Sequence, residues 1–167
     1  MDFYDVIRTR RSIREYQEKP VEEDKLRRVL EAARLAPSAA NRQPWRFVVI
    51  KTEKIKKEFY RVYNKRWFWH APVVICACGV RKEAWRRPDG KSYLDVDVAI
   101  AMDHLILAAT AEGLGTCWIG AFNPSEVKKI LDLSDELEPI ALTPLGYPAF
   151  SPHPTPRKPL EEIVRRI

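Results

Sequence analysis

Three guanidinium groups and one hydroxyl lie within five residues near the start of the chain. They belong to Arg10, Arg11, Ser12 and Arg14. Arginine offers forked hydrogen-bond donors that match a phosphate, and a serine hydroxyl adds one further donor. The segment therefore predicts a clamp for a phosphate or a similar anion. A run of charges taken alone is more often a solvated surface, so other segments must decide between the two interpretations.

Three other segments are candidates for the same site. Residues 37–45, Pro-Ser-Ala-Ala-Asn-Arg-Gln-Pro-Trp, combine small residues, which let a planar ligand approach the backbone, with amides that can recognise polar edges. Residues 113–122, Gly-Leu-Gly-Thr-Cys-Trp-Ile-Gly-Ala-Phe, hold glycines that allow the backbone to lie against a flat ring. Arg157 and Lys158 end a proline-rich stretch that could return positive charge to the anion. Each segment is also compatible with a purely structural role.

Several common catalytic classes have no motif in this chain. Neither the hydrolase pattern Gly-x-Ser-x-Gly nor the phosphate loop Gly-x4-Gly-Lys-Ser/Thr occurs. Residues 113–115 follow an expected helix and lack the third glycine of a dinucleotide-binding fingerprint. The three histidines are too widely spaced to predict a zinc site, and we expect no metal. Any reaction would therefore depend on a bound cofactor.

Composition indicates one globular domain spanning residues 1–167. The chain is 46% hydrophobic and 31% charged, and its net charge of +6 could attract either nucleic acid or an anionic small molecule. No leader pattern and no apolar run of membrane-spanning length occurs, so we expect a cytoplasmic protein. Heavy use of Lys, Arg and Glu beside few amides suggests a thermophile source. The cysteines, which lie in apolar runs, are expected to be buried free thiols: Cys76, Cys78 and Cys117.

Hydrophobic periodicity predicts a mixture of helices and strands around these segments. Helices are expected over residues 2–8, 22–36, 52–69, 95–112 and 124–131, and strands over residues 45–50, 73–78, 115–120 and 139–145. The strand over 73–78 is apolar throughout, which predicts a central position with both faces covered. Residues 81–93 are expected to form an exposed loop, and prolines between 148 and 159 a stiff tail.

The expected helix over 95–112 is apolar on nearly every side. A helix of this kind must be buried all round, either in a core or at a subunit interface. A domain of this size has little room to enclose it completely. We therefore expect a homodimer.

The four segments, taken in order, resemble the nitroreductase family of FMN-dependent oxidoreductases. The resemblance rests on Arg-Arg-Ser-Ile-Arg, Ala-Pro-Ser-Ala-Ala-Asn-Arg-Gln-Pro-Trp, Gly-Leu-Gly-Thr-Cys-Trp-Ile-Gly-Ala-Phe and Pro-Leu-Gly-Tyr-Pro, and it runs from about Phe3 to the C-terminus. It implies an α+β fold with a central, mostly antiparallel sheet flanked by helices. It also implies an intertwined homodimer with the long buried helix and two FMN molecules at the interface.

The resemblance assigns roles to particular residues. Arg10, Arg11, Ser12 and Arg14 would hold the FMN phosphate and the adjacent flavin edge, with Arg157 and Lys158 completing the phosphate site. The loop would reach the cofactor from the partner subunit through Pro37, Ser38, Ala39 and Asn41. Ile119 and Gly120 would place backbone beside the flavin ring, and Asn64 falls where many members have a flavin-contacting asparagine.

The implied activity needs no acid or nucleophile from the protein. NADH or NADPH would reduce FMN, and a nitroaromatic, a quinone or another flavin would then take the electrons in a ping-pong cycle. Flavin reduction leaves negative charge near N1 and O2, which a nearby cation favours, and Arg10 is the candidate for this electrostatic role. Many members carry a lysine shortly after the asparagine, whereas this chain has Arg66 and Trp67, so the N1/O2 partner stays open.

Two alternatives remain at this point. Reductive dehalogenation or flavin fragmentation would use the same FMN site. A basic nucleic-acid-binding module would use the cations of residues 8–14 and 81–87, with tryptophans for stacking. The segment after Cys78 is short for this family, so the site would be open, and residues 67–69 could line it or pack in the core.

Overall fold

The computed structural model describes residues 2–167, with all side chains among them except those of residues 54 and 56. Its elements, in chain order, are α1 (Phe3–Thr9), α2 (Glu23–Arg34), the 3-10 turn η1 (Ala39–Asn41), β1 (Trp45–Lys51), η2 (Thr52–Lys54), α3 (Lys56–Val62), α4 (Arg66–His70), β2 (Val73–Val80), η3 (Arg81–Glu83), α5 (Leu94–Ala111), β3 (Gly115–Thr116), α6 (Pro124–Ile130), β4 (Leu137–Gly146) and α7 (Leu160–Ile163).

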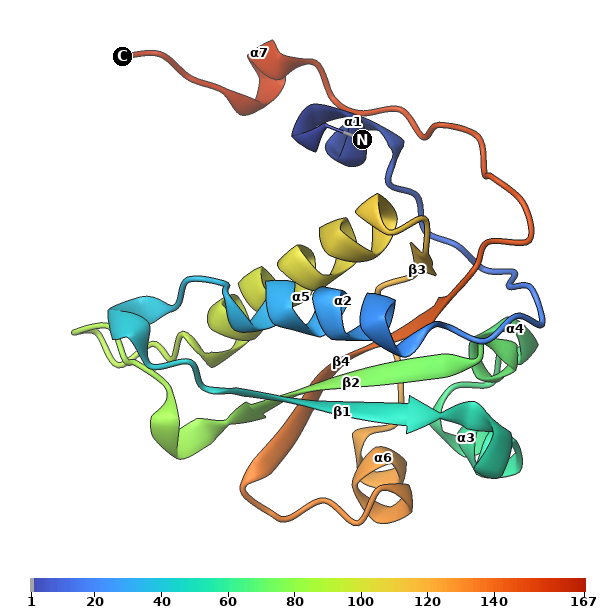
Figure 1. The fold of residues 1–167 in the computed structure, drawn as a ribbon. Helices are drawn as coiled ribbons and strands as arrows, with labels where there is room; N and C mark the ends of the chain where they lie inside the picture. The colour runs from blue at the N-terminus through green and yellow to red at the C-terminus, as the bar shows by residue number, and fades with distance from the viewer. Residues whose placement is uncertain (1) are drawn as a thin grey trace.

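The four strands form one sheet in the order β1-β2-β4-β3, and every neighbouring pair is antiparallel. Ala77 of β2 lies opposite Phe47 of β1 on one side and Ala141 of β4 on the other. The sequence-based prediction of a central strand over 73–78 is therefore confirmed. Figure 1 shows α2 and α5 on one side of this sheet and α3, α4 and α6 around its other side.

Side chains of β2 alternate between two separate cores, as the pleat of a strand requires. Ile75 and Ala77 pack with α2 and α5, whereas Cys76 and Cys78 pack with α3, α4 and α6. All eight residues of β2 are buried because helices cover both faces. The cysteines are free and buried, as the sequence indicated.

The prediction of one helix over residues 52–69 is wrong, because these residues form three separate elements, η2, α3 and α4. Tyr63 takes an extended backbone, and its ring packs edge-on against Phe68 with the centroids 5.5 Å apart. The carbonyl of Val62 accepts a hydrogen bond from Asn123 N at 3.0 Å, so α6 engages the broken end of α3. Phe68 is fully buried, which places it in the core and not in a ligand site.

The expected strand over 115–120 is also too long. Thr116 pairs with Leu145, so the next residue, Cys117, would face Pro144, which has no N–H to give. Pairing there would leave the Cys117 carbonyl without a donor, and the Cys117 N–H donates to the hydroxyl of Thr143 at 3.2 Å. Pairing resumes only as a single bridge between Ile119 and Leu142.

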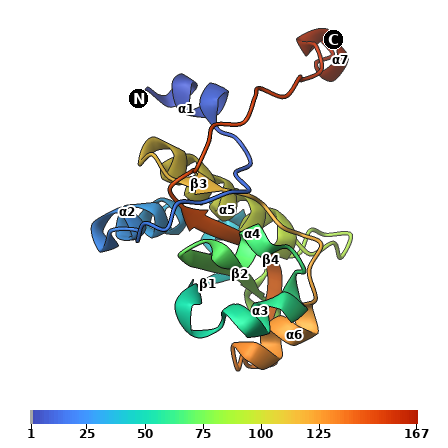
Figure 2. The same ribbon diagram turned by 90° about the vertical axis from the view of Figure 1, so that its right-hand side faces the viewer.

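The two termini lie on the side of α5 that faces away from the sheet. After β4 the chain runs as an extended arm over the prolines to the short helix α7, and Figure 2 shows the arm leaving the body of the molecule. The predicted extended course of this tail is confirmed, and its stiffness stays a prediction. Among the described residues, no helix combines the length and the apolar character needed to cross a membrane.

Candidate functional site

The arginine-rich segment lies against the short strand β3. Ile13 N donates a hydrogen bond to the Thr116 carbonyl at 2.8 Å, and Ser12 forms a parallel bridge with Thr116. Gly115 makes this approach possible, since a Cβ there would lie only 2.6 Å from Cγ1 of Ile13. These backbone contacts thus fix the positions from which the side chains of the neighbouring arginines extend.

Three polar side chains of this segment converge on one thiol. Burial raises the pKa of Cys117, while the positive charges of Arg14 and Arg10 and a hydrogen bond from Ser12 act in the opposite direction. Burial and the nearby Cys117 raise the pKa of Tyr16, and the positive charge of Arg14 opposes that shift. The structure therefore brings Arg10, Ser12 and Arg14 together at the C-terminal side of α5, and this group is called the cationic end below.

Arg11 has a different role from its neighbours. Its Nη1 donates to the carbonyls of Arg8 at 2.7 Å and Arg10 at 2.8 Å. Cationic donors at the last carbonyls of a helix stabilise its C-terminus. In this chain Arg11 caps the C-terminus of α1. The other N–H groups of its guanidinium are the donors available to a ligand.

The predicted ring-contacting residues continue from the cationic end. Ile119 is buried and exchanges two backbone hydrogen bonds with Leu142, at 2.9 and 3.0 Å. Gly120 follows it and is exposed, and a Cβ added there would meet nothing within 4 Å. Asn64 is exposed in the break between α3 and α4. The hydrogen bond from Asn123 N to the Val62 carbonyl joins this break to the segment after Gly120.

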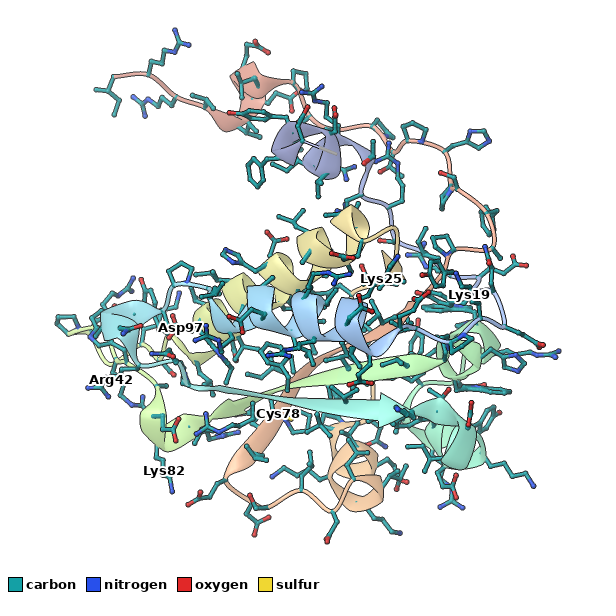
Figure 3. The ribbon with its side chains drawn as sticks, in the orientation of Figure 1. Lys19, Lys25, Arg42, Cys78, Lys82 and Asp97 are labelled. Carbon is teal, nitrogen blue, oxygen red and sulfur yellow. The ribbon has the colours of Figure 1, made fainter. Side chains whose placement is uncertain are left out.

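The small-residue loop lies at the other end of α5. Ala39 N donates to Oδ1 of Asp97, in the first turns of that helix, at 2.9 Å. Within the loop, Ser38 Oγ accepts from Gln43 N at 2.9 Å, and Gln43 Nε2 donates to Asn41 Oδ1 at 3.1 Å. Figure 3 shows Asp97 and Arg42 at this end of the molecule and Lys25 toward the other. Residues 38–43 are called the anchored loop below.

Helix α5 separates the anchored loop from the cationic end. At the standard rise per residue, the part of the helix between Asp97 and Ala111 is about 20 Å long. Ser12 and Thr116 pair beyond the C-terminal end of that part. One chain therefore does not bring the two groups to one small ligand.

The C-terminal arm carries the last two predicted site residues. Arg157 and Lys158 are exposed, and Arg157 Nη1 donates to Thr155 Oγ1 at 2.7 Å. Among residues 2–167, no recorded contact joins them to the cationic end. Their assignment to the phosphate stays a prediction.

Sequence reasoning missed Asp97. A carboxylate among the apolar residues of the first turn was the available signal, because such a group is rarely buried without a partner, but Asp95 in the same turn carries the same signal and is exposed. The link between Cys117 and the arginines could not be read from spacing, since they lie more than a hundred residues apart in the sequence.

Comparison with known families matches residues 7–65 and 57–147 to the Nitroreductase family. The chain belongs to the nitroreductase family. It is 33% identical to an NADH dehydrogenase of Thermus thermophilus over 93% of this chain and 91% of that protein. A crystal structure of a nitroreductase family protein from Clostridium difficile is 38% identical, with a TM-score of 0.90 over 99% of this chain and 98% of the other. The predicted family and α+β fold are confirmed.

Two further nitroreductase relatives carry informative names. An FMN reductase [NAD(P)H] of Bacillus subtilis is 29% identical over 92% of this chain and 68% of that protein. An iodotyrosine deiodinase of Thermotoga neapolitana is 30% identical over 98% of this chain and 96% of that protein. Oxidoreductases of more than one substrate class are thus similar to this chain.

Proposed function

We propose that the chain is an FMN-dependent oxidoreductase that takes electrons from NADH or NADPH and passes them to a nitroaromatic, quinone or flavin acceptor. The observation that carries the proposal is the convergence of Arg10, Ser12 and Arg14 beside a segment that leads to the open Gly120. The names of the Thermus and Bacillus relatives support the same class of reaction.

The donor set of the cationic end fits the phosphate of FMN. Two guanidinium groups and a hydroxyl can supply several charge-assisted hydrogen bonds to one phosphate. Cys117, which they surround, is buried and contributes no charge of its own while its thiol is protonated. Arg157 and Lys158 would add further charge if the arm reached this end.

Each remaining residue has a task in holding the cofactor. The backbone at Ile119 and Gly120 would lie along the flavin ring, because no side chain occupies the space at Gly120. Asn64 would donate to a ring edge from the neighbouring break. Arg10 keeps a positive charge on this side of the site, which favours negative charge on a bound group. When bound, FMN supplies the two-electron chemistry between nicotinamide and acceptor.

A homodimer would complete the site. The anchored loop and Pro37 lie at the far end of α5 from the cationic end, so a second subunit would have to supply them. Apolar side chains are exposed on α1 and on the arm, which is expected of surfaces that become buried on assembly. The most exposed are Phe3, Tyr4, Leu160, Ile163 and Ile167.

A second candidate activity is reductive dehalogenation at the same site. The similarity to the Thermotoga deiodinase favours it. It would need a halogenated aromatic acceptor, and it differs from the first proposal in the acceptor alone. Profiling acceptors with the FMN-loaded protein separates the two activities.

The first experiment is an absorption spectrum of the purified protein with and without added FMN, followed by anaerobic NADH or NADPH. We expect flavin bands equivalent to about one FMN per subunit, as a symmetric dimer with two sites requires. Either nucleotide should bleach them. Sedimentation should report about twice the monomer mass of 19.4 kDa.

A protein that stays colourless in the presence of FMN would overturn the proposal. Salt-dependent binding to DNA or RNA by that colourless protein would favour the nucleic-acid module instead. If the protein contains flavin but neither NADH nor NADPH reduces it, the proposed cofactor stands and the proposed electron donors are wrong.

A further inference from the structure

The backbone of the anchored loop is strained, and contacts within the loop do not explain what holds it in this conformation. Ala40, Asn41 and Gln43 have φ values of 51°, 53° and 49°, in the left-handed region that side chains with a Cβ disfavour. Three such residues within four positions persist only where surrounding contacts hold them. The question is which contact does so.

Most hydrogen bonds of the anchored loop stay inside it. Gln43 bonds to Ser38 and Asn41, Asn41 N donates to the Ser38 carbonyl at 3.0 Å, and Arg42 N donates to the Ala39 carbonyl. Among the residues that the structure describes, only the bond from Ala39 N to Asp97 joins residues 38–43 to another element. Asp97 is therefore the anchor between the loop and α5.

The carboxylate of Asp97 is costly for stability alone. Only 1% of the residue is exposed, and its Oδ2 accepts no hydrogen bond from any described residue. A buried polar atom without a partner loses its hydration and gains nothing in return. The α5 N-terminus favours a negative charge nearby and offsets part of that cost. The one hydrogen bond that this buried side chain makes with the described residues is the bond from Ala39 N, so its visible effect is on the loop.

We infer that Asp97 is a positioning residue of the proposed flavin site. Through Ala39 it sets the conformation of the loop that one subunit presents to the cofactor held by its partner. Asp97 itself touches no cofactor in this arrangement. This inference rests on the proposed function, because the loop matters for binding only if the site takes FMN.

The test compares Asp97→Ala with a matched control, Asp95→Ala. Asp95 is exposed on the same first turn of α5, so both variants remove one carboxylate near the helix N-terminus, but only one removes the anchor. We expect Asp97→Ala to weaken FMN binding about tenfold, the scale of one charge-assisted hydrogen bond. Asp95→Ala should bind FMN like the wild type, and Asp97→Asn should stay close to it because its amide oxygen still accepts from Ala39.

A rescue experiment separates positioning from general stability. Glycine adopts positive φ without the Cβ penalty, so Ala40→Gly in the Asp97→Ala background should recover part of the FMN affinity. In the FMN-free protein, Asp97→Ala should speed amide hydrogen exchange in residues 38–43 and leave exchange in β2 and β4 unchanged.

Two outcomes overturn the inference. One is Asp97→Ala retaining both wild-type FMN affinity and wild-type exchange in the loop. The other is faster exchange throughout the chain with no rescue by Ala40→Gly, which would make Asp97 a folding residue. If the wild-type protein binds no FMN, the proposed function fails separately, and the exchange comparison still decides whether Asp97 holds the loop.

Discussion

The two ends of α5 support the proposed site in different ways. The cationic end depends on side-chain charge, with Arg10, Ser12 and Arg14 gathered around a buried thiol. The anchored loop depends on backbone shape, with three left-handed residues in a loop that Ala39 joins to the carboxylate of Asp97. One end can thus be altered by removing charge, whereas the other responds to changes in backbone freedom.

This difference bears on how the site is assembled. Charged side chains reach a ligand over several ångströms, but a backbone edge has to be placed beside it. A rigid helix between the two ends keeps them apart within one chain, so in the proposed dimer each site would take one end from each subunit. The predictions that follow test that arrangement.

The largest effect is expected from a heterodimer in which one subunit has a mutated cationic end and the other has a mutated anchored loop. One subunit carries Arg10→Ala and Arg14→Ala, and the other carries Ser38→Ala and Asn41→Ala. If each site combines the two subunits, the heterodimer keeps one intact site and should bind about one FMN per dimer. Purification through two different tags, followed by a flavin titration, measures this stoichiometry.

The two mutant homodimers, prepared in the same way, are the controls. Each should lose most FMN binding, because every one of its sites contains a defect. A heterodimer that binds no more FMN than the homodimers would show that both ends serve a site within one subunit. That result would leave the separation along α5 without a functional meaning.

The sequence predicted the buried strands and helices of this fold better than the points at which helices and strands are interrupted. The apolar run 73–78 and the helix over 95–112 were predictable because burial on several sides leaves a strong pattern. The break at Tyr63 was not, because it depends on a ring contact with Phe68 and a backbone bond from Asn123, which is distant in sequence. The early end of β3 was readable in principle from Pro144, once the register was known.

The candidate site shows the same division. Arg10, Ser12 and Arg14 were predictable because their spacing and residue types together suggest an anion clamp. Their gathering around Cys117 and the role of Asp97 depend on tertiary contacts that no local pattern contains. The meeting of the two ends depends on a second subunit, and it stays a prediction.

Two glycines of the segment 113–122, Gly115 and Gly120, should separate stability from binding. Gly115→Ala places a Cβ against Ile13 and should lower the free energy of unfolding by about 1–3 kcal/mol, the usual cost of overpacking. Gly120→Ala meets open space, so stability should change by less than about 0.5 kcal/mol. FMN affinity should nevertheless fall by at least about threefold, because the new methyl group occupies the surface proposed for the ring.

Denaturant unfolding of the FMN-free variants and flavin titration of the folded ones measure these two quantities independently. Gly113 lies in the same segment, has a φ of 76° and also faces open space, so Gly113→Ala reports backbone strain without crowding. Undiminished FMN affinity in Gly120→Ala would remove this glycine from the ring surface and leave the arginines untouched.

The smallest effect concerns Glu112, which follows the C-terminal end of α5 and lies outside the proposed site. Its carboxylate accepts two hydrogen bonds from Arg28 of α2, at 2.7 and 2.9 Å, where α5 ends. The Arg28 guanidinium holds the pKa of Glu112 below its ordinary value of 4.5. The pair therefore stabilises the fold above that value, and the contribution is lost as the pH falls through the lowered pKa.

Glu112→Gln should consequently lower the melting temperature by about 2 °C at pH 7, since exposed ion pairs contribute little. The difference from the wild type should shrink as the pH falls below 4.5 and disappear once the wild-type carboxylate is protonated in the folded protein as well. Thermal unfolding across that pH range measures both values. A difference that persists in acid would mean that Glu112 acts through packing at the end of α5 and not through its charge.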